Sequence, residues 1–471
     1  MRRKALDLCL GEKMKRNYSN VFITKLFSIS RCEIPQNVLN MARYCVLDSI
    51  GCMLAGGILA REKITNYINT SEPGSVPPIG FSQKISVMEA AFVNAIAAHV
   101  NELDDGNRNG MVHLSSPIIS ALLSVANINK MNGETVLRGI VVGYESAIRL
   151  AELVQPGHKK KGYHATGTCG AFGVAMGIAT MRNYTLNQMK DAASAALAGA
   201  GGLLEMIEGN SELKPFNAAR AAVDGILAAN VAWAGFNGPE DALGGERGFI
   251  QVLGCGVDDV IFDRVMAESW RILTIYRKPY ASCRHSHPAV DAALQIRDRE
   301  AIRTEQIQTI RVQTYDLAVF GHNHTEINGV NSAKMSTPYA VAVALCEGKA
   351  GVTEFTNERI QDNQILDLAK KIQVMESEEL SVLVPRKRAA IVEIVVNSGE
   401  TYTARSNYPK GEPENPMSDE ELITKFIDLA RYGGMIGKNA EKLVEIILDR
   451  DFSLNGIYKV MDEDLADRKG K

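Results

Sequence analysis

The hydrophobic period of this chain changes near residue 270, and that change constrains the fold more than any other feature of the sequence. Before it, apolar residues recur every three or four positions, and runs such as AASAALAGAGGLL (192–204) are typical of helices that pack closely through small side chains. Beyond it, QIQTIRVQTY (306–315) and AAIVEIVVNSGETYTARS (389–406) alternate as strands do, the second as a hairpin around residues 397–399. We therefore expect a mainly α protein, with a large all-helical domain and a smaller α+β domain.

The length of the chain, 471 residues, exceeds what one hydrophobic core usually supports, so more than one domain is expected. We expect the helical domain over residues 1–269 and the α+β domain over residues 270–408. After that, DEELITKFIDLA (419–430) is again amphipathic. Residues 409–471 are therefore expected to form C-terminal helices that return to the helical domain.

Capping residues mark several helix starts. Pro35 suits the beginning of a helix, and Ser86 with Glu89 forms a possible capping box. Ser116 is expected to cap a further helix, with Pro117 in its first turn.

Charge and cysteine usage exclude several classes of protein. The formal net charge is −3, so no overall field attracts the chain to nucleic acid or to an anionic membrane. The sequence contains no run of eighteen apolar residues, so we expect no membrane span. The eight cysteines are scattered and show no CxxC pair, which favours a reducing cytoplasm and argues against a disulfide framework or an iron–sulfur cluster. The basic start, MRRKALDLCLGEKMKRN, lacks a long apolar core and is expected to be a short extension rather than a signal peptide.

Four polar clusters stand out against the apolar helices. HVNELDDGNRNGMVHLSSP (99–117) carries Asp104 and His113 between two expected helices, and KKKGYHATGTCGAFG (159–173) places His164 before a glycine-rich helix start. EGNSELKPFNAARAA (208–222) places Lys214 before another helix, and YRKPYASCRHSHPA (276–289) gathers two of the eight histidines with arginine, lysine, tyrosine and cysteine. The first cluster, taken alone, is as well explained by a solvated loop, and a lone lysine beside a proline is usually on the surface.

The four clusters together resemble the MmgE/PrpD family, which includes 2-methylcitrate dehydratases, cis-aconitate decarboxylases and iminodisuccinate epimerases. The resemblance is carried by LDSIGCMLAG (47–56), NELDD followed by HLSSP, GYHATGTCGAFG, LKPFNAARAA, KPYASCRHSHPAVDAAL (278–294), STPYAVAVAL (336–345) and NPMSDEELITKF (415–426), in that order along nearly the whole chain. It implies a large helical domain with a smaller α+β lid, a homodimer, and an enzyme that acts on small di- or tricarboxylic acids without a metal or an organic cofactor.

Chemistry of this kind requires cations for the spectator carboxylates and an acid or base at the carbon beside a carboxylate. By position, the resemblance implies that His113 and His164 transfer protons, that Asp104 orients a histidine, and that Lys214 and Lys278 hold carboxylates. The rest of the fourth cluster is expected to contact the substrate as well; these residues are Tyr280, Cys283, Arg284, His285 and His287.

We expect a lyase of the 2-methylcitrate dehydratase type, with an iminodisuccinate epimerase-like isomerase and then a cis-aconitate decarboxylase as alternatives. Cys283 occupies a position where animal-type decarboxylases carry histidine, and the SCRH sequence around it is more frequent among dehydratases and epimerases. No residue decides between the three reactions. A non-catalytic carboxylate-binding protein is the alternative from another class.

Metal binding is the main competing interpretation of the histidines. HSH (285–287) and HNH (322–324) pair imidazoles two residues apart, as zinc or nickel sites can. Residues i and i+2 share a face of a strand but not of a helix, and Pro288 suggests that a helix begins there. We therefore expect no metal site. Cys283 as a covalent nucleophile is a further alternative, since Arg284 and His285 beside it would lower its pKa.

Overall fold

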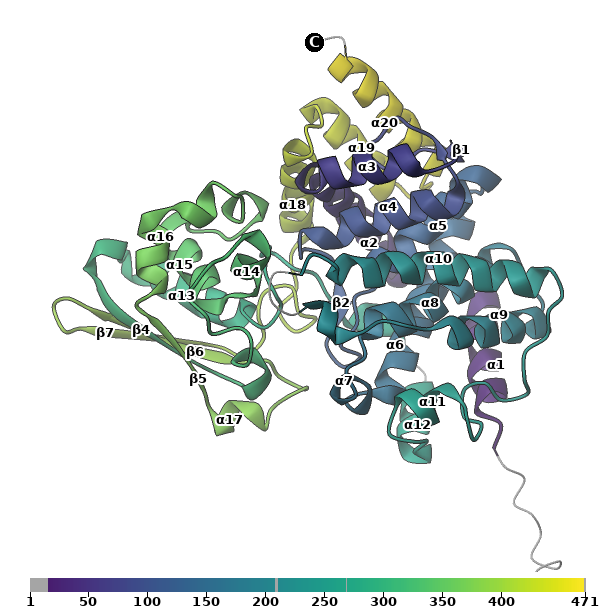
Figure 1. The fold of residues 1–471 in the computed structure, drawn as a ribbon, viewed down its shortest axis with the longest axis horizontal. Coiled ribbons are helices and arrows are strands. Elements are labelled where there is room, and N and C mark those ends of the chain that lie inside the picture. Colours follow the sequence, from purple (N-terminus) through teal and green to yellow (C-terminus); the bar gives the residue numbers. More distant parts are fainter. Residues whose placement is uncertain (1–15, 208–210, 268, 470–471) are drawn as a thin grey trace, which may run out of the picture.

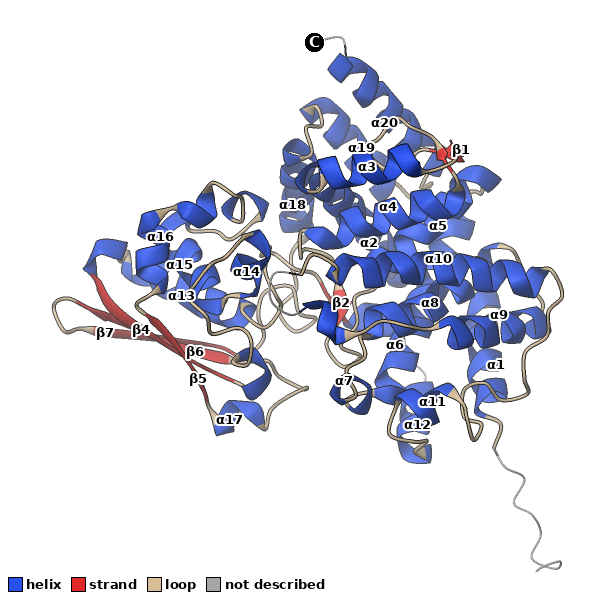
Figure 2. Ribbon diagram, in the orientation of Figure 1, coloured by secondary structure: helices blue, strands red, loops and turns tan. Residues whose placement is uncertain are grey.

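The structure is a computed structural model that describes residues 16–207, 211–267 and 269–469. Two regions lie beside each other in Figure 1, a large helical region and a smaller α+β region, and Figure 2 shows that the long strands belong to the smaller one. The mainly α class with a smaller α+β part is confirmed. The expected N-terminal extension lies largely outside the described residues.

Most of the helical region precedes the α+β region in sequence. Its helices are α1 (Tyr18–Arg31), α2 (Gln36–Leu59), α3 (Arg61–Thr70), α4 (Val87–Val100), α5 (Ser115–Asn129), α6 (Gly133–Val154), α7 (Gly157–Lys160), α8 (Ala165–Met181), α9 (Leu186–Gly199), α10 (Lys214–Trp233), α11 (Phe249–Leu253) and α12 (Asp259–Met266). Short elements complete it: the 3-10 turns η1 (Leu204–Ile207) and η2 (Arg271–Thr274), and the strands β1 (Pro73–Val76), β2 (Gly106–Asn107) and β3 (Ile275–Tyr276), of which β2 and β3 pair antiparallel.

Helix α8 lies at the centre of this region and contacts α5, α6, α9 and α10. Small residues allow the close approach that the alanine- and glycine-rich sequence predicted. A Cβ atom on Gly173 would lie 2.8 Å from the carbonyl oxygen of Gly143, and one on Gly177 would lie 2.9 Å from that of Gly139. Larger side chains at these positions would therefore push α6 and α8 apart.

Helix α2 is the only helix in the described part of the chain with the length and hydropathy to cross a membrane. Within the fold, 83% of its most apolar window is buried. That burial is the pattern of a helix in the core of a globular region.

The α+β region is built on a four-stranded sheet in the order β5-β4-β6-β7, in which β4 and β5 are parallel and the other pairs antiparallel. Its elements are α13 (His287–Glu300), η3 (Thr304–Gln306), β4 (Ile307–Thr314), η4 (Asp316–Ala318), α14 (Val330–Met335), α15 (Thr337–Glu347), η5 (Val352–Glu354), η6 (Arg359–Gln361), α16 (Asn363–Ala369), β5 (Ile372–Glu376), α17 (Glu378–Ser381), β6 (Ala390–Val396) and β7 (Thr401–Ser406). The expected hairpin is confirmed as β6–β7, whereas β5 lay outside the strands read from the sequence.

The chain then returns to the helical region through α18 (Asp419–Tyr432), α19 (Gly437–Leu448) and α20 (Leu454–Lys469). Helices α18 and α19 contact α2, and α20 contacts α5. One hydrophobic core combines side chains from Phe22 to Ile275 with side chains from Phe426 onward, and a second joins the sheet to α13 and α15. The second core also takes in Cys52, Ala55, Leu103 and Leu429 of the helical region, and the expected boundaries near residues 270 and 408 stay a prediction.

The capping predictions were right at one helix and wrong at another. Ser86 and Glu89 form the expected capping box of α4. Helix α5, however, begins at Ser115 after Leu114, and Ser116 does not cap it. The hydroxyl of Ser116 donates instead to Oδ2 of Asp104 at 2.7 Å. Burying a carboxylate without hydrogen-bond donors costs much free energy, so this hydrogen bond stabilises Asp104.

Candidate active site

A buried carboxylate, Asp104, organises two histidines where α4 ends and α5 begins. Its Oδ2 atom lies 2.7 Å from Nδ1 of His99 and 3.3 Å from Nδ1 of His113. The two imidazole rings meet edge to face with their centroids 4.8 Å apart, and the ring of His99 is 6.3 Å from that of His164. The structure thus brings together three residues expected from the sequence, Asp104, His113 and His164, around a histidine that was not.

His164 is the residue before the first turn of α8, and the side-chain amide of Asn217 donates to its Nδ1 atom at 3.1 Å. On the other side of the group, Nε2 of His99 and Oδ1 of Asp104 are buried and have no hydrogen-bond partner among the described residues. Buried polar atoms are rarely left without partners unless a ligand or water serves them. These two atoms are therefore available to a polar ligand.

Electrostatics fix the protonation states in this cluster. Burial opposes ionisation of Asp104, but the two histidines outweigh it and hold the pKa of the carboxyl well below its usual range. Burial lowers the pKa of His113 to about 4, and the Lys278 ammonium contributes. The pKa of His164 is likewise lowered, by burial and then by nearby cations that include Lys214. At neutral pH both expected proton-transfer residues are neutral imidazoles, which are bases.

A second buried carboxylate, Glu102, joins the cations of the site. One of its oxygens pairs with the ammonium of Lys214, and the other lies 3.2 Å from Nζ of Lys278, which also donates to the Glu102 carbonyl at 3.0 Å. Burial opposes ionisation here too, yet the two lysines hold the pKa of Glu102 well below its usual range. The backbone of Glu102 is left-handed, with φ at 57°, an unusual conformation for a non-glycine residue.

Lys334 is a third lysine of this group, contributed by α14 of the α+β region. Its Nζ donates to the carbonyl of Val100 at 2.9 Å. Burial and then the charges of Lys214 and Lys278 lower its pKa to about 8, although Glu102 acts in the opposite direction. Three lysines and one carboxylate leave an excess of positive charge, which suits a ligand with more than one carboxylate.

Cys283 and His285 lie on the α+β side of the site. Sγ of Cys283 is 3.9 Å from Nε2 of His322, and the ring centroids of His285 and His322 are 5.2 Å apart. Burial works to raise the pKa of the thiol, but His322 and then Lys214 outweigh it and lower the pKa to about 6. The pKa of His285 is lowered by burial and by cations that include Lys159 and Arg388.

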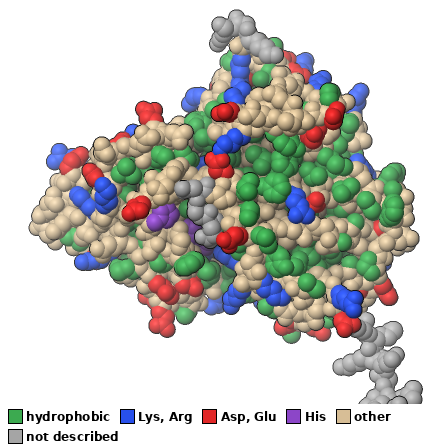
Figure 3. Space-filling model, viewed as in Figure 1, with side chains coloured by type: hydrophobic (Ala, Val, Ile, Leu, Met, Phe, Trp, Pro, Cys, Tyr) green, Lys and Arg blue, Asp and Glu red, His purple; other side chains and the backbone are tan. Residues whose placement is uncertain are grey.

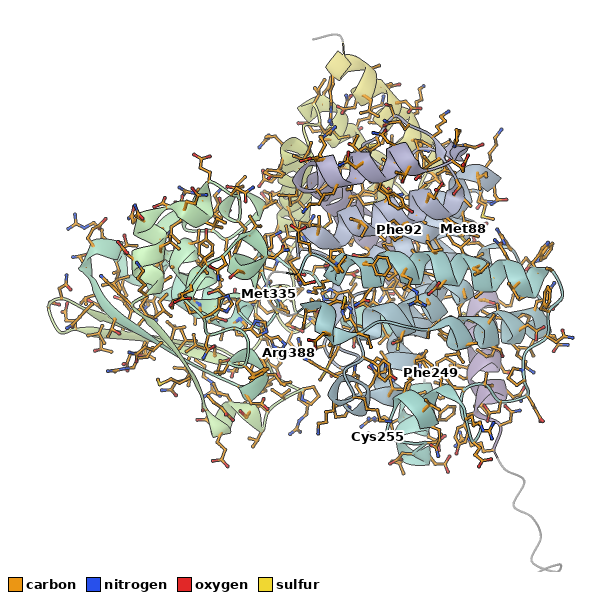
Figure 4. The ribbon with its side chains drawn as sticks, in the orientation of Figure 1. Met88, Phe92, Phe249, Cys255, Met335 and Arg388 are labelled. Atoms are coloured by element: carbon orange, nitrogen blue, oxygen red, sulfur yellow. The ribbon has the colours of Figure 1, made fainter. Side chains whose placement is uncertain are left out.

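Figure 4 shows Arg388 and Met335 at the junction of the two regions, and Figure 3 shows histidine side chains at the molecular surface there. We call the two sides of this site the helical bank (His99, Glu102, Asp104, His113, His164 and Lys214) and the α+β bank (Cys283, His285, His322 and Arg388). Lys214 affects the pKa of both His164 and His285, so the two banks lie within electrostatic reach of one ammonium group.

Three expected substrate ligands are engaged elsewhere. Arg284 pairs with Glu412 at 2.9 Å and donates to Nδ1 of His287 at 2.7 Å, while Nε2 of His287 contacts the carbonyl of Ser282 at 3.2 Å. Tyr280 donates to Asp291. It lines a separate cavity of about 750 Å³ beside α18. The structure does not bring Tyr280, Arg284 and His287 into contact with the two banks.

Several site residues escaped the sequence analysis. His99 and Glu102 lie in the first polar cluster and could have been found there, because both are titratable and follow an apolar helix. Lys159 lies in the second polar cluster and could have been found there too, whereas Arg388 carried no comparable signal. Lys334 lay outside every motif and expected helix, and His322 was considered only within the HNH motif.

The fold and the candidate site together define a class: a protein with a mostly helical body, an α+β region beside it, and a buried group of lysines and histidines where the two regions meet. Family models extend this conclusion. The MmgE/PrpD N-terminal domain matches residues 24–259 and the MmgE/PrpD C-terminal domain matches residues 280–452, so the chain belongs to the MmgE/PrpD family.

Curated relatives agree with that assignment. The chain is 26% identical to a cis-aconitate decarboxylase of Aspergillus terreus over 462 residues, which is 91% of this chain and 93% of the relative. It is 23% identical to the human cis-aconitate decarboxylase over 430 residues, 88% of each chain. The protein is therefore an MmgE/PrpD-type enzyme, and a lyase, either a decarboxylase or a dehydratase, is the class that these similarities support.

Proposed function

We propose that this enzyme is a lyase for small acids of the citrate and aconitate type, with three carboxylates on a short carbon skeleton. The observation that carries the proposal is the lysine group around Glu102. Lys214 and Lys278 pair with one internal carboxylate, and Lys334 adds a third ammonium that the same carboxylate stabilises electrostatically. Nε2 of His99 and Oδ1 of Asp104 lack partners among the described residues. A tricarboxylate would supply anions to the lysines and a reacting carbon to the histidines.

Decarboxylation of cis-aconitate is the first reaction we propose, because the relatives named above are decarboxylases of that acid. In this reaction the carbon–carboxylate bond breaks, carbon dioxide leaves, and the electron pair passes to the carbon skeleton. An imidazolium then donates a proton to the carbon of the skeleton that carries this electron pair. The negative charges of a bound tricarboxylate would raise the pKa of His113 and His164 and so help either of them to carry that proton.

Dehydration of a hydroxy acid of the 2-methylcitrate type is the second candidate. It is favoured by the low pKa of His113, since a neutral imidazole can remove the proton on the carbon beside a carboxylate. The hydroxyl then leaves as water after it receives a proton. Both reactions place an aconitate skeleton in the site, as substrate in the first and as product in the second.

Proton NMR in heavy water tests the proposal. The purified enzyme is incubated separately with cis-aconitate, 2-methylcitrate and iminodisuccinate. Loss of a carboxylate with deuterium at the product carbon identifies a decarboxylase, appearance of an alkene from the saturated hydroxy acid identifies a dehydratase, and deuteration without net loss identifies an epimerase. Turnover of iminodisuccinate alone, or of none of the three acids, would refute the proposed lyase.

We also propose that two copies associate through an apolar face on α3, α4 and α10. The rings of Tyr67 and Phe92 stack at 4.8 Å, and Phe216 meets Phe92 at 6.0 Å. Phe216 and Leu227 are 41% and 50% exposed. Figure 3 shows hydrophobic side chains gathered on this face, and Figure 4 labels Met88 and Phe92 there. Contiguous exposed apolar surface of this kind marks a protein contact.

Light scattering after gel filtration tests the association. We expect a dimer for the natural chain and a monomer for Phe216→Lys with Leu227→Lys. The control is Val260→Lys on α12, since Val260 is 79% exposed and lies outside this face. A monomeric natural chain, or a dimer that survives the double substitution, would refute this surface as the interface.

A further inference from the structure

The two histidine motifs of the α+β region each present one histidine to the same cysteine. From HSH (285–287), His285 faces Cys283, and from HNH (322–324), His322 does so. The sulfur of Cys283 and a ring nitrogen of each histidine all lie within 4.8 Å of one another. The remaining histidines of the motifs are used elsewhere, because His287 contacts Arg284 and Ser282, and His324 contacts Ser332 at 3.1 Å.

Both imidazoles are oriented through their other nitrogen. Nδ1–H of His322 donates to the carbonyl oxygen of Met335 at 2.8 Å, which leaves the Nε2 lone pair directed toward the thiol. Nδ1 of His285 lies 2.7 Å from the hydroxyl of Tyr315, and donation of its proton to that oxygen leaves its Nε2 atom free as well. Metal-binding histidines are held in this way, by a hydrogen bond from the nitrogen that does not bind the ion.

The histidine cluster on the helical bank differs in its third member. There, Nδ1 of His99 lies 2.7 Å from Oδ2 of Asp104, whereas Nδ1 of His113 donates to the carbonyl oxygen of Asp105 at 3.1 Å and lies 3.3 Å from the same Asp104 oxygen. Ligand atoms of these three side chains also lie within 4.8 Å of one another, but the third ligand is a carboxylate that already accepts the Ser116 hydroxyl at 2.7 Å. The α+β cluster offers a thiol instead.

We propose that Cys283, His285 and His322 form a binding site for a thiophilic divalent metal ion such as zinc, with a fourth coordination position left to a water molecule or another ligand. This inference is independent of the proposed lyase function. In tetrahedral zinc sites the metal–nitrogen and metal–sulfur distances are about 2.0 and 2.3 Å, which places ligand atoms roughly 3.3–3.6 Å apart. The three side chains would have to contract by about 1 Å from their present separations, within the reach of small torsional changes. Cysteine with histidine selects zinc, cobalt or copper over magnesium or calcium.

The charges around the cluster make the thiolate the decisive ligand. Lys159, Lys214 and Arg388 face it, and no carboxylate forms an ion pair with any of its three members in the described part of the chain. These cations disfavour a divalent ion, while the sulfur supplies negative charge. On binding, the sulfur–metal bond forms and any proton held on Cys283 or on Nε2 of His322 is released.

Titration of the full-length enzyme with cobalt(II), without substrate, tests the site. We expect one equivalent to bind with a thiolate-to-cobalt charge-transfer band in the near ultraviolet, and the band to be absent in Cys283→Ser. His322→Ala should weaken binding at least about tenfold, as loss of one protein ligand does. The matched control, His324→Ala, removes a histidine of the same motif that does not face the cluster and should leave the band and the affinity unchanged.

Zinc should displace the cobalt and abolish the band. Absence of a charge-transfer band in the natural enzyme, persistence of the band in Cys283→Ser, or equal loss of binding in His322→Ala and His324→Ala would each overturn the proposed site. Because the absorbance is measured without turnover, this result and the outcome of the substrate experiment are separate. A chain that converts cis-aconitate but never binds cobalt refutes the metal site alone.

Discussion

On the helical bank two groups of imidazoles or ammonium ions each enclose a carboxylate, whereas no carboxylate pairs with the α+β bank. Asp104 lies between His99 and His113, and Glu102 lies between Lys214 and Lys278. On the α+β bank, Cys283 and Arg388 form no ion pair with a carboxylate within the described ranges. Similar residue types thus create two environments. On the helical bank the carboxylates determine the protonation states of the histidines, which suits proton transfer. On the α+β bank no carboxylate competes for the cations or the thiol, so anions or soft metal ions can bind there.

The largest effect that follows from this contrast is on the helical bank. We expect His113→Ala to lower kcat by about 10²–10⁴-fold, the usual contribution of a positioned acid or base. His285→Ala on the opposite bank should act mainly on KM. Steady-state kinetics of both variants with the accepted substrate make the comparison. A loss of kcat for His285→Ala as large as that for His113→Ala would remove the functional distinction between the banks.

The next effect concerns Glu102. Glu102→Gln keeps the shape but leaves Lys214 and Lys278 without their anion, and breaking a buried pair costs about 3–5 kcal/mol of unfolding free energy. Chemical denaturation measures the loss, with Glu393→Gln in the exposed pair with Arg311 as the control, where we expect about 0–1 kcal/mol. A tricarboxylate should restore more stability to Glu102→Gln than to the natural chain. An equal gain in stability in both proteins would mean that a substrate carboxylate does not take the position of the Glu102 carboxylate between the two lysines.

The pH dependence of kcat/KM separates the two proposed reactions. The pKa of His113 is lowered to about 4, so its neutral form predominates above that pH. If His113 removes a proton, kcat/KM should stay constant from neutral pH downward and fall tenfold per pH unit below about 4. If its protonated form is required in the free enzyme, kcat/KM should instead rise as the pH falls toward 4. Stopped assays between pH 3.5 and 7 on the folded enzyme, checked by circular dichroism, decide between these outcomes.

The smallest predicted effect belongs to Lys334, which joins the two banks. Its pKa is lowered to about 8, so it carries its charge below that pH and loses it above. We expect KM for a tricarboxylate to rise at least about twofold between pH 7 and 9, since even a partly exposed cation contributes about 0.5–1 kcal/mol to such a contact. In Lys334→Met this rise should vanish. A KM that changes equally in both proteins would assign the titration to another group.

The sequence predicted the elements of the fold better than the details of the site. Helical periodicity over residues 419–430 located α18 (Asp419–Tyr432) closely, because its apolar residues form a face that only a helix can bury. The expected cap at Ser116 was wrong, since the hydroxyl serves Asp104, a partner that lies twelve residues away and becomes a neighbour only through the turn between α4 and α5. Local rules do not include tertiary partners of this kind.

The site was predictable where its residues are clustered in sequence and not where they converge from distant segments. Asp104 and His113 lie in one loop, and both were identified. Lys334 comes from α14, more than two hundred residues later, and reaches the site only because the α+β region covers the end of α4. In each of the HSH and HNH motifs one histidine faces Cys283 and the other does not. The sequence did not predict this difference, because it depends on the course of the backbone around Cys283.

The α+β region enters and leaves the helical body at almost one point. The amide of Arg277, on the way in, donates to the carbonyl of Gly411, on the way out, at 3.0 Å, and a Cβ atom on Gly411 would lie 1.7 Å from the Arg277 oxygen. Because its two ends lie side by side, the segment between them can be treated as an inserted cassette. A fold tolerates such an insertion when the backbone before it and the backbone after it remain adjacent. Exchanging that cassette between family members, with Gly411 retained, would transplant the α+β bank while leaving Asp104 and its two histidines in place.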